Sequence, residues 1–467
     1  MKKSMIEKLG EECGVFGIYA PEKKDSISTI SYLGLLALQH RGQESAGICV
    51  NDSGNLKNHK AMGLVSNVFN EEILNKLQGE MAIGHVRYST SGSSMLTNAQ
   101  PLLINCNKGY LSLAHNGNLI NAAELRQNLE SHGSIFHSTL DTEVIAHLVA
   151  RSFEDNLIDA LTQTLHQLKG GYSIVAMTRD NLVAARDPFG LRPLVLGRME
   201  TGYVIASETC AFDIIGAEFI REIEPGELIV IDRDGIKSHH YSSNKPYRFC
   251  VFEFIYFARP DSNIGGQNVH LARREMGRQM AREIKVEADI VVPVPDSGKS
   301  AAMGFAEESG IPYTKGILRN RYVGRTFIQP TQEIRDLKVR IKLSPIKEVI
   351  KGKRVILVDD SIVRGTTSRQ IINRVREAGA KEVHIAISSP PVINPCYYGI
   401  DISNCQELIA RQMDLEGICE HIGADSLNYL SIKGLLKSIK AVDYGFCTAC
   451  FSGEYPVGSE LVNKGVK

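Results

Sequence analysis

The sequence predicts an α/β protein with two domains. Its 467 residues are too many for one ordinary compact domain and enough for two domains with full cores. The first half contains many short strand patterns and few helical ones, which is typical of packed sheets with helices outside. From Ala288 onward, strand and helix patterns alternate, as they do in the βαβ units of a parallel sheet.

In the first half, apolar segments bounded by glycine and polar residues predict strands. Helices are expected at residues 26–39, 124–129 and 141–148, where apolar residues recur at helical spacing. The pattern changes near Pro246, which suggests a boundary between domains. The predicted strands are CGVFGIYA, AMGLVSNVF, MAIGHVRYST, YLSLAHNGNL, YSIVAMTRD, NLVAARD and YVIASE.

In the second half, the segments DIVVPVP, RVILVDD and EVHIAISSP predict strands. Helices are expected at 299–309 and 366–378, and each is followed by a glycine that can end it. The segment Arg319 to Ser344 is rich in arginine and has no clear period. It fits a mobile basic loop beside an anionic ligand and, equally well, a solvated surface excursion.

The composition points to small-molecule partners. The chain has 53 basic and 53 acidic residues, so no bulk charge draws it to nucleic acid or to an anionic membrane. No stretch approaches eighteen apolar residues, and residues 1–12 lack the apolar core of a signal peptide, so a cytoplasmic location is expected. Structural disulfides are rare there. The ten cysteines are therefore expected to be buried thiols, a nucleophile or metal ligands.

One strand end has the chemistry of a sugar-phosphate site. The apolar run RVILV ends in two acids and a loop that leads into a helix. Helix N-terminal amides and hydroxyls can hold phosphate, while carboxylates can accept hydrogen bonds from ribose or help hold hydrated magnesium. Acids and hydroxyls that only cap the helix are the alternative. The candidate residues are Asp359, Asp360, Arg364, Gly365, Thr366, Thr367 and Ser368.

A second strand end, in VVPVPDSGKSAAMG, could cradle a pyrophosphate group. Its candidate residues are Asp296, Ser297, Gly298 and Lys299, and ordinary helix capping is again the alternative. The chain has no G-x-x-x-x-G-K-[ST] segment, which excludes a P-loop nucleotide hydrolase.

Cys13 follows a short polar leader and begins the first predicted strand. Removal of residues 1–12 would give Cys13 a free α-amine, whose reference pKa of about 7.7 to 8.0 suits a general base at neutral pH. The thiol could then attack an amide carbonyl. A small buried core cysteine is the alternative from this residue alone.

Cys447 and Cys450 form a C-x-x-C near the end of the chain. This spacing is compatible with a redox pair, half of a zinc site, or two ligands of an iron–sulfur cluster.

Taken together, these motifs resemble the amidophosphoribosyltransferase family, in its leader-containing iron–sulfur subgroup. After Cys13, the blocks HRGQESAG, GHVRYST, HNGNL and DTE match the family's glutaminase half in order, and RVILVDDSIVRGTTS resembles the phosphoribosylpyrophosphate motif of type I phosphoribosyltransferases. The resemblance implies an N-terminal-nucleophile αββα sandwich followed by a type I phosphoribosyltransferase parallel-sheet domain. It places a propeptide at 1–12, a class II glutamine amidotransferase domain at 13–232, and the transferase with a cluster-binding tail at 247–457.

The resemblance also implies roles for single residues. It assigns the oxyanion donors to the Asn116 side chain and the Gly117 amide, the glutamine α-carboxylate to Arg87, and the glutamine α-ammonium to Asp141. Magnesium is associated with Ser297, Asp359 and Asp360. The 4Fe-4S ligands are expected to be Cys250, Cys396, Cys447 and Cys450, with zinc as the main competitor. The remaining thiols are expected to be small hydrophobic groups: Cys49, Cys106, Cys210, Cys405 and Cys419. Cys405 and Cys419 are the alternatives for a cluster ligand.

The implied activity is glutamine hydrolysis at Cys13, with transfer of ammonia through an apolar passage to phosphoribosylpyrophosphate. The products would be 5-phosphoribosylamine, pyrophosphate and glutamate, at the start of purine synthesis. Purine nucleotide inhibitors and a homotetramer are further expectations from the family. Two alternatives remain: another class II amidotransferase, and a non-catalytic phosphoribosylpyrophosphate-sensing regulator.

Overall fold

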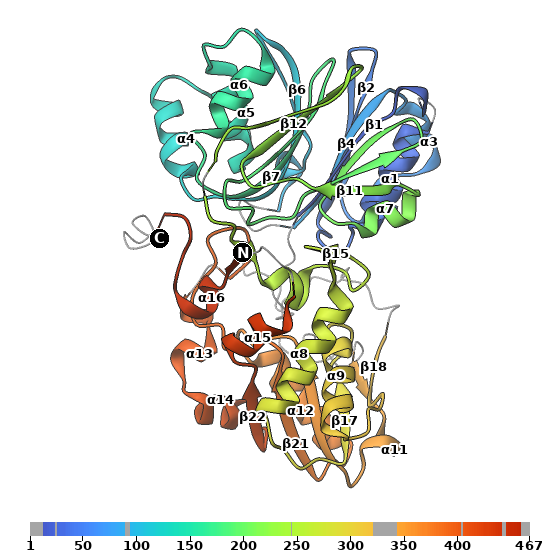
Figure 1. The fold of residues 1–467 in the computed structure, drawn as a ribbon, viewed down its shortest axis with the longest axis vertical. Helices are drawn as coiled ribbons and strands as arrows, with labels where there is room; N and C mark the ends of the chain where they lie inside the picture. The colour runs from blue at the N-terminus through green and yellow to red at the C-terminus, as the bar shows by residue number, and fades with distance from the viewer. Residues whose placement is uncertain are drawn as a thin grey trace.

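The structure, a computed structural model, describes residues 13–23, 26–88, 94–243, 245–320, 343–402, 405–440 and 445–458. The predicted leader, 1–12, and residues 321–342 of the predicted basic loop lie outside the described residues. Two domains lie one after the other along the long axis of the molecule (Figure 1). Within the described ranges, no helix has both the length and the apolar character needed to cross a membrane.

The first domain contains two antiparallel sheets that pack face to face. The seven-stranded sheet has the order β11-β9-β10-β1-β4-β2-β3, and the six-stranded sheet has the order β13-β12-β8-β7-β6-β5. The strands of the first sheet are β1 Gly14–Tyr19, β2 Ser45–Asp52, β3 Asn55–Met62, β4 Met81–Arg87, β9 Val195–Met199, β10 Gly202–Ala206 and β11 Glu218–Glu222. Those of the second are β5 Leu102–Cys106, β6 Gly109–Leu119, β7 Gly170–Met177, β8 Leu182–Arg186, β12 Glu227–Asp232 and β13 Gly235–His240.

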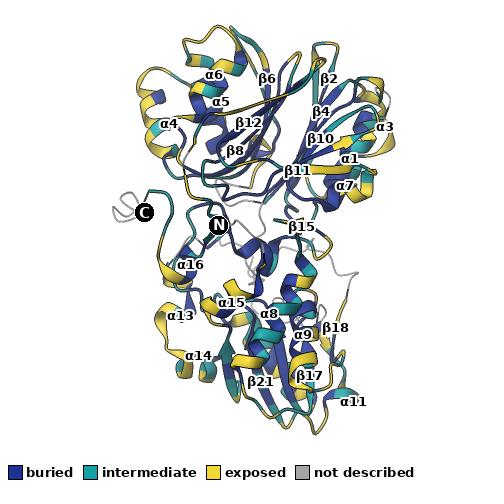
Figure 2. Ribbon diagram, viewed as in Figure 1, coloured by how far each residue is buried: buried dark blue, intermediate teal, exposed yellow. Residues whose placement is uncertain are grey.

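Helices cover the outer face of each sheet, which confirms the αββα sandwich (Figures 1 and 2). Side chains alternate between the two faces of a strand. On β7, Val175 packs between the sheets, while Ile174 and Ala176 pack under the helices. The helices over the first sheet are α1 Ile27–Ala37, α2 Val65–Val68, α3 Glu71–Lys76 and α7 Cys210–Ile215; those over the second are α4 Ala122–Ser131, α5 Asp141–Arg151 and α6 Leu157–Leu165.

Two sequence expectations for this domain need correction. The segment AMGLVSNVF was expected to be a strand, but β3 ends at Met62 and residues 65–68 form α2. Gly63 has φ +128°, a backbone conformation that ends the strand and turns the chain into the helix. The six-stranded sheet also continues past the predicted domain limit at residue 232, because β13 pairs with β12.

The second domain is built on a parallel four-stranded sheet with helices on both faces. The strand order is β17-β20-β21-β22, and the bounds are β17 Ile290–Pro293, β20 Arg354–Asp359, β21 Glu382–Ile387 and β22 Ser426–Tyr429. Ile356 and Val358 face one core, and Val355 and Leu357 face the other, so the strand is apolar throughout. The covering helices are α8 Val269–Glu283, α9 Lys299–Ser309, α12 Thr366–Glu377, α14 Leu415–Ile422 and α15 Ile432–Ser438.

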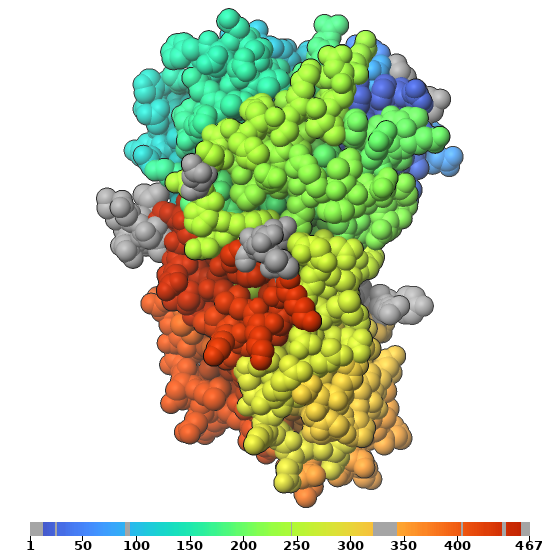
Figure 3. All heavy atoms as spheres, viewed as in Figure 1, coloured from blue at the N-terminus to red at the C-terminus, as the bar shows by residue number. Residues whose placement is uncertain are grey.

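The C-terminal residues return to the junction between the domains. The short strands β14 Phe249–Cys250 and β23 Phe446–Cys447 form a parallel pair, and α16 Ala449–Ser452 follows. The sphere representation shows the red C-terminal segment at the level where the two domains meet (Figure 3). The tail is therefore part of the domain junction.

Candidate active sites

Cys13 directly precedes β1 and lies beside the end of β4. Gly14 pairs with Val86, so Cys13 at the start of β1 lies beside the end of β4 at Arg87. The Cys13 thiol is 3.5 Å from the carbonyl oxygen of Tyr88. Burial raises the pKa of this thiol to about 11, so it is protonated at neutral pH in the unprocessed chain.

Asn116 and Gly117 lie on β6. Asn116 is buried, and its Nδ2 has no hydrogen-bond partner within the described part of the chain. A buried amide without a partner costs about 1 to 3 kcal/mol, so such a group is a candidate for ligand binding. Gly117 has φ +144°, and a Cβ there would lie 2.0 Å from the Gly171 carbonyl oxygen, so this position requires glycine.

Arg87 and Asp141 supply opposite charges near the thiol. Both act electrostatically on Cys13, and both are buried. Arg87 is 3.5 Å from Glu44, and Asp141 accepts a hydrogen bond of 3.1 Å from the Leu119 amide. Burial acts to raise the pKa of Asp141, but the nearby His115 and hydrogen bonds outweigh it and lower the pKa overall. Asp141 is therefore a carboxylate at neutral pH.

Two buried histidines support these groups. The His115 ring lies 3.3 Å from Thr142 Oγ1 and 3.5 Å from Asp141 Oδ1. His85 Nε2 is 3.1 Å from the His115 carbonyl oxygen, and burial lowers the pKa of His85 to about 3, so its ring is neutral and donates this bond. His85 lies in the block GHVRYST and His115 in HNGNL, but the strand pattern did not indicate a function for either residue.

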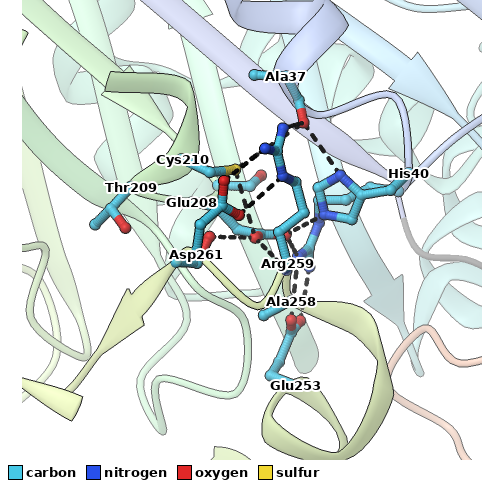
Figure 4. Close-up of polar contacts among 12 residues, drawn as sticks. Ala37, His40, Glu208, Thr209, Cys210, Glu253, Ala258, Arg259 and Asp261 are labelled. Atoms are coloured by element: carbon cyan, nitrogen blue, oxygen red, sulfur yellow. Dashed lines mark hydrogen bonds and ion pairs between the residues drawn. The ribbon is translucent and has the colours of Figure 1, made fainter. Parts of the chain in front are cut away.

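A buried polar cluster joins the Cys13 strand to the second domain. Arg41 Nε donates to the Cys13 carbonyl oxygen at 3.2 Å, and its Nη2 is 2.7 Å from Glu253 Oε1. Figure 4 shows Glu208 facing His40 and Arg259, with Glu253 beside this cluster. The His40 ring is 2.7 Å from Glu208, which also accepts from the Arg259 amide at 2.9 Å. The Cys13 backbone is thus connected through Arg41 to Glu253 of the second domain.

The two predicted phosphate segments lie together at the carboxyl ends of neighbouring strands. Pro293 on β17 pairs with Val358 on β20, and the Val294 amide donates to the Val358 carbonyl oxygen at 2.9 Å. A Cβ on Gly298 would lie 2.2 Å from that same oxygen, so only glycine allows the approach. The structure thus brings the segments at 296–299 and 359–368 to one sheet edge.

Around this edge, several charged side chains contact one another. Asp296 forms ion pairs with Lys299 and, at 2.6 Å, with Arg319. Arg364 Nε donates to Glu407 at 2.8 Å. Burial acts to raise the pKa of Asp296, but Lys299 and Arg319 outweigh it and lower the pKa overall. Binding an anion here would exchange these internal pairs for contacts with the ligand.

The acids and the helix start complete the edge. Asp359 and Asp360 are buried, and Asp359 Oδ1 accepts from the Asp360 amide at 2.9 Å. Helix α12 begins at Thr366 after Gly365, which has φ +79°, and no side chain caps its first turn. Thr366 is exposed, and Thr367 and Ser368 are partly buried. Amides and hydroxyls at such a helix start can bind a phosphate.

Four cysteines line one cavity at the domain junction. Its lining includes Cys250, Cys396, Cys447 and Cys450 together with apolar residues such as Leu191 and Ile400. The β14–β23 pair sets Cys250 opposite Cys447. Burial raises the pKa of Cys447 to about 12. Within the described ranges, no three cysteine, histidine or acidic side chains converge closely enough to hold one metal ion.

Known families match both halves of the chain. A family model described as a glutamine amidotransferase domain matches residues 85–213, and one described as a phosphoribosyl transferase domain matches residues 266–411. The amidophosphoribosyltransferase of Bacillus subtilis (strain 168) is 54% identical over 97% of this chain and 95% of the relative. The chain belongs to the amidophosphoribosyltransferase family. It is an enzyme of the first step of purine biosynthesis, and the two alternatives from the sequence are set aside.

Other relatives of the family agree. The amidophosphoribosyltransferase of Methanocaldococcus jannaschii is 50% identical over 95% of this chain and 97% of the relative. A solved structure of the Bacillus subtilis amidotransferase complexed with ADP and GMP has a TM-score of 0.90 at 52% identity, covering 96% of this chain and 98% of that one. A structure described as the allosteric regulatory enzyme of purine biosynthesis also has a TM-score of 0.90. The two-domain fold class is therefore confirmed.

Proposed function

We propose that the enzyme divides its reaction between the two sites, with Cys13 hydrolysing glutamine and the β17–β20 edge transferring the phosphoribosyl group. The main support is the buried side-chain amide of Asn116, which lies in the same domain as Cys13. Its Nδ2 has no hydrogen-bond partner within the described residues. We assign the glutaminase to the residues from Cys13 through β13, and the transferase with its cysteine-bearing tail to 247–457.

At the first site, the Cys13 sulfur attacks the side-chain carbonyl carbon of glutamine. Asn116 Nδ2 and the Gly117 amide donate to the negatively charged oxygen of the tetrahedral intermediate. The base that took the thiol proton gives it to the nitrogen as the carbon–nitrogen bond breaks, so ammonia leaves, and water hydrolyses the thioester to glutamate. A base is required, because a thiol with a pKa of about 11 is protonated at neutral pH. Removal of residues 1–12 would supply it as the α-amine of Cys13.

The ends of the glutamine molecule match two buried charges. The Arg87 guanidinium would bind the α-carboxylate and the Asp141 carboxylate would bind the α-ammonium. The lowered pKa of Asp141 supports this role, since a protonated carboxyl would not attract an ammonium group.

At the second site, ammonia attacks the anomeric carbon of phosphoribosylpyrophosphate and pyrophosphate leaves. The amides and hydroxyls of residues 365–368 would hold the 5-phosphate, and residues 296–299 would face the pyrophosphate. Magnesium bound there would neutralise charge on the departing pyrophosphate. Ser297, Asp359 and Asp360 suit it, because magnesium is usually held by one or two carboxylates together with substrate phosphates. Ammonia must cross the domain junction to reach this site, for which we propose an apolar passage.

We assign a 4Fe-4S cluster to the cavity lined by Cys250, Cys396, Cys447 and Cys450. All four cysteines line this one cavity, and four thiolates are the ligand set of a 4Fe-4S cluster. A zinc ion held by four cysteines is the competing assignment. Such a cluster would be structural, because neither half-reaction transfers electrons.

Regulation by purine nucleotides and assembly into a homotetramer complete the proposal. The relative from Bacillus subtilis was solved with ADP and GMP bound, which supports nucleotide control of this enzyme.

The test is pyrophosphate release from phosphoribosylpyrophosphate by anaerobically purified enzyme, with glutamine or ammonium as the nitrogen donor. Cys13→Ala and Asn116→Ala should lose the glutamine reaction, by at least about 10⁴-fold and about 10²- to 10³-fold respectively. Both should keep the ammonium reaction, and Cys106→Ser serves as the matched cysteine control. Retained glutamine activity in either variant would remove that residue from the mechanism.

A second experiment tests the cluster. Iron, sulfide and zinc are measured per chain after anaerobic purification, in wild type and in Cys396→Ser, with Cys419→Ser as control. About four irons and four sulfides, lost only in Cys396→Ser, support the assignment; zinc without sulfide contradicts it.

A further inference from the structure

A segment of the second domain lies directly against the strand that carries the oxyanion donors. Asn118 Nδ2 donates to the Tyr397 carbonyl oxygen at 2.8 Å. A Cβ on Gly399 would lie 3.2 Å from both Cα and the carbonyl carbon of Gly117, so the two glycine backbones are in close contact. The segment 397–399 thus touches both residues that follow Asn116.

A second residue of the first domain also binds this segment. Arg192, which is fully buried, donates from Nε to the Tyr398 carbonyl oxygen at 2.8 Å. The Tyr398 hydroxyl donates to the Val457 carbonyl oxygen at 2.8 Å and accepts from the Val457 amide at 3.0 Å. The segment is therefore fixed between the glutaminase sheet and the C-terminal tail.

We propose that segment 397–399 positions the oxyanion donors of the glutaminase, with Asn118 as the positioning residue that connects them. The inference rests on the proposed role of Asn116 and Gly117. An oxyanion donor must be held within about 0.5 Å of its productive geometry, so a support that contacts Gly117 directly controls the rate of glutamine hydrolysis. The second domain thereby completes the first domain's active site.

The same segment begins at the cysteine-lined cavity. The Tyr398 amide donates to the Cys396 sulfur at 3.4 Å, and the Cys396 amide donates to the Ile402 carbonyl oxygen at 2.8 Å. In the lining of the same cavity, the Cys250 amide donates to the Leu191 carbonyl oxygen at 3.2 Å. A change at Cys396 is therefore expected to move the segment whose Gly399 contacts Gly117.

The experiment compares Asn118→Ala with Asn118→Gln, which retains the amide donor, and with Asn105→Ala, an exposed asparagine of the same sheet. In Asn118→Ala, kcat for glutamine hydrolysis should fall about tenfold or more while KM for glutamine changes less than about twofold. Hydrogen exchange of residues 111–119 should become faster. Ammonium-dependent activity and iron content per chain should match wild type. Asn118→Gln should recover part of kcat, and Asn105→Ala should change neither readout.

Cys396→Ser gives an independent readout of the same contact. It should accelerate hydrogen exchange of residues 111–119 in the full-length protein; if it does not fold, Gly399→Ala takes its place. Wild-type kcat and exchange in Asn118→Ala, with Asn116→Ala inactive, would overturn the positioning role alone. Full glutamine activity in Asn116→Ala would instead overturn the proposed oxyanion assignment.

Discussion

In the first domain the charges assigned to glutamine are buried and held by neighbouring strands, whereas in the second domain many of the charges assigned to phosphoribosylpyrophosphate pair with one another at the surface. Arg87 and Asp141 are 1% and 7% exposed. The side chains of Asp296, Lys299 and Arg319 are 44%, 39% and 40% exposed. The glutamine site is thus formed before substrate binds, while the phosphoribosyl site must exchange internal ion pairs for its ligand.

This difference has a physical basis. A neutral amide such as Asn116 can stay buried without a partner at a cost of about 1 to 3 kcal/mol. Unpaired buried charges cost much more, so a site that binds a highly charged substrate keeps its cations solvated or paired until the substrate arrives. Substitutions in the two regions should therefore fail in different ways.

Of the substitutions expected to affect both nitrogen donors, the largest effect is expected from Asp359→Asn combined with Asp360→Asn. This change removes the carboxylates proposed to bind magnesium and should lower pyrophosphate release about 10³-fold or more with either nitrogen donor. Glu416→Gln, an exposed acid of the same domain, is the control. Steady-state rates with glutamine and with ammonium measure the effect. Loss of only the glutamine reaction would contradict the assignment of the two half-reactions to separate domains.

Gly117→Ala should give the opposite selectivity. The new Cβ would lie 2.0 Å from the Gly171 carbonyl oxygen, so β6 must move and the oxyanion donors move with it. Glutamine hydrolysis should fall about 10²-fold, and the ammonium reaction should be retained. Gly133→Ala, in a turn with open space around it, is the matched control. An equal loss with both donors would contradict a local effect.

Gly298→Ala tests the second region with the same chemical change. Its Cβ would lie 2.2 Å from the Val358 carbonyl oxygen and would push segment 296–299 off the strand end. We expect KM for phosphoribosylpyrophosphate to rise about tenfold with both donors, because a displaced cradle loses pyrophosphate contacts. Initial rates over a range of substrate concentrations measure this. A change confined to the glutamine reaction would place the residue outside the phosphoribosyl site.

The pH dependence of Cys13 alkylation tests whether the thiol is desolvated. With a pKa of about 11, the thiolate fraction in the unprocessed chain rises about tenfold per pH unit through neutral and mildly alkaline pH. Alkylation of Cys13, followed by mass spectrometry of its peptide, should rise in parallel and level off near pH 11. A plateau near pH 8 in a chain that retains residues 1–12 would contradict the desolvated thiol.

The smallest effect is expected from Glu407→Gln. This change frees Arg364, whose partner is 45% exposed, and exposed pairs contribute only about 0 to 1 kcal/mol. KM for phosphoribosylpyrophosphate should fall by no more than about fivefold at low salt, and high salt should reduce the difference. An increase in KM would mean that Glu407 holds Arg364 in its binding position.

The sequence predicted the regular parts of the fold well. The helix expected at 299–309 is α9 with the same bounds, because Gly310, at φ +74°, ends it. Helix α8 was not predicted, since its many arginines obscure an apolar face of Val269, Ala272, Met276 and Met280. Local spacing thus identified the elements with sharp stop signals and missed α8 and several others, among them β2, α14, α15 and β22.

For the sites, the motifs named the residues but not their supports. The residues expected at two separate strand ends lie at one edge, as parallel-strand geometry requires. The contact between Asn118 and Tyr397 joins residues 279 positions apart, and no local pattern in one sequence announces it. The same holds for Arg41 and Glu253, whose burial depends on how the two domains meet.

The pairing of β14 with β23 has a consequence for the order of events during synthesis. Cys250 leaves the ribosome well before Cys447 and Cys450, which follow it by 197 and 200 residues. The glutaminase sheets, which draw their strands from residues before 241, can fold earlier. The cysteine-lined cavity can therefore form only after residue 450 has been made, so a product truncated before β23 contains Cys13 but lacks part of the cavity wall.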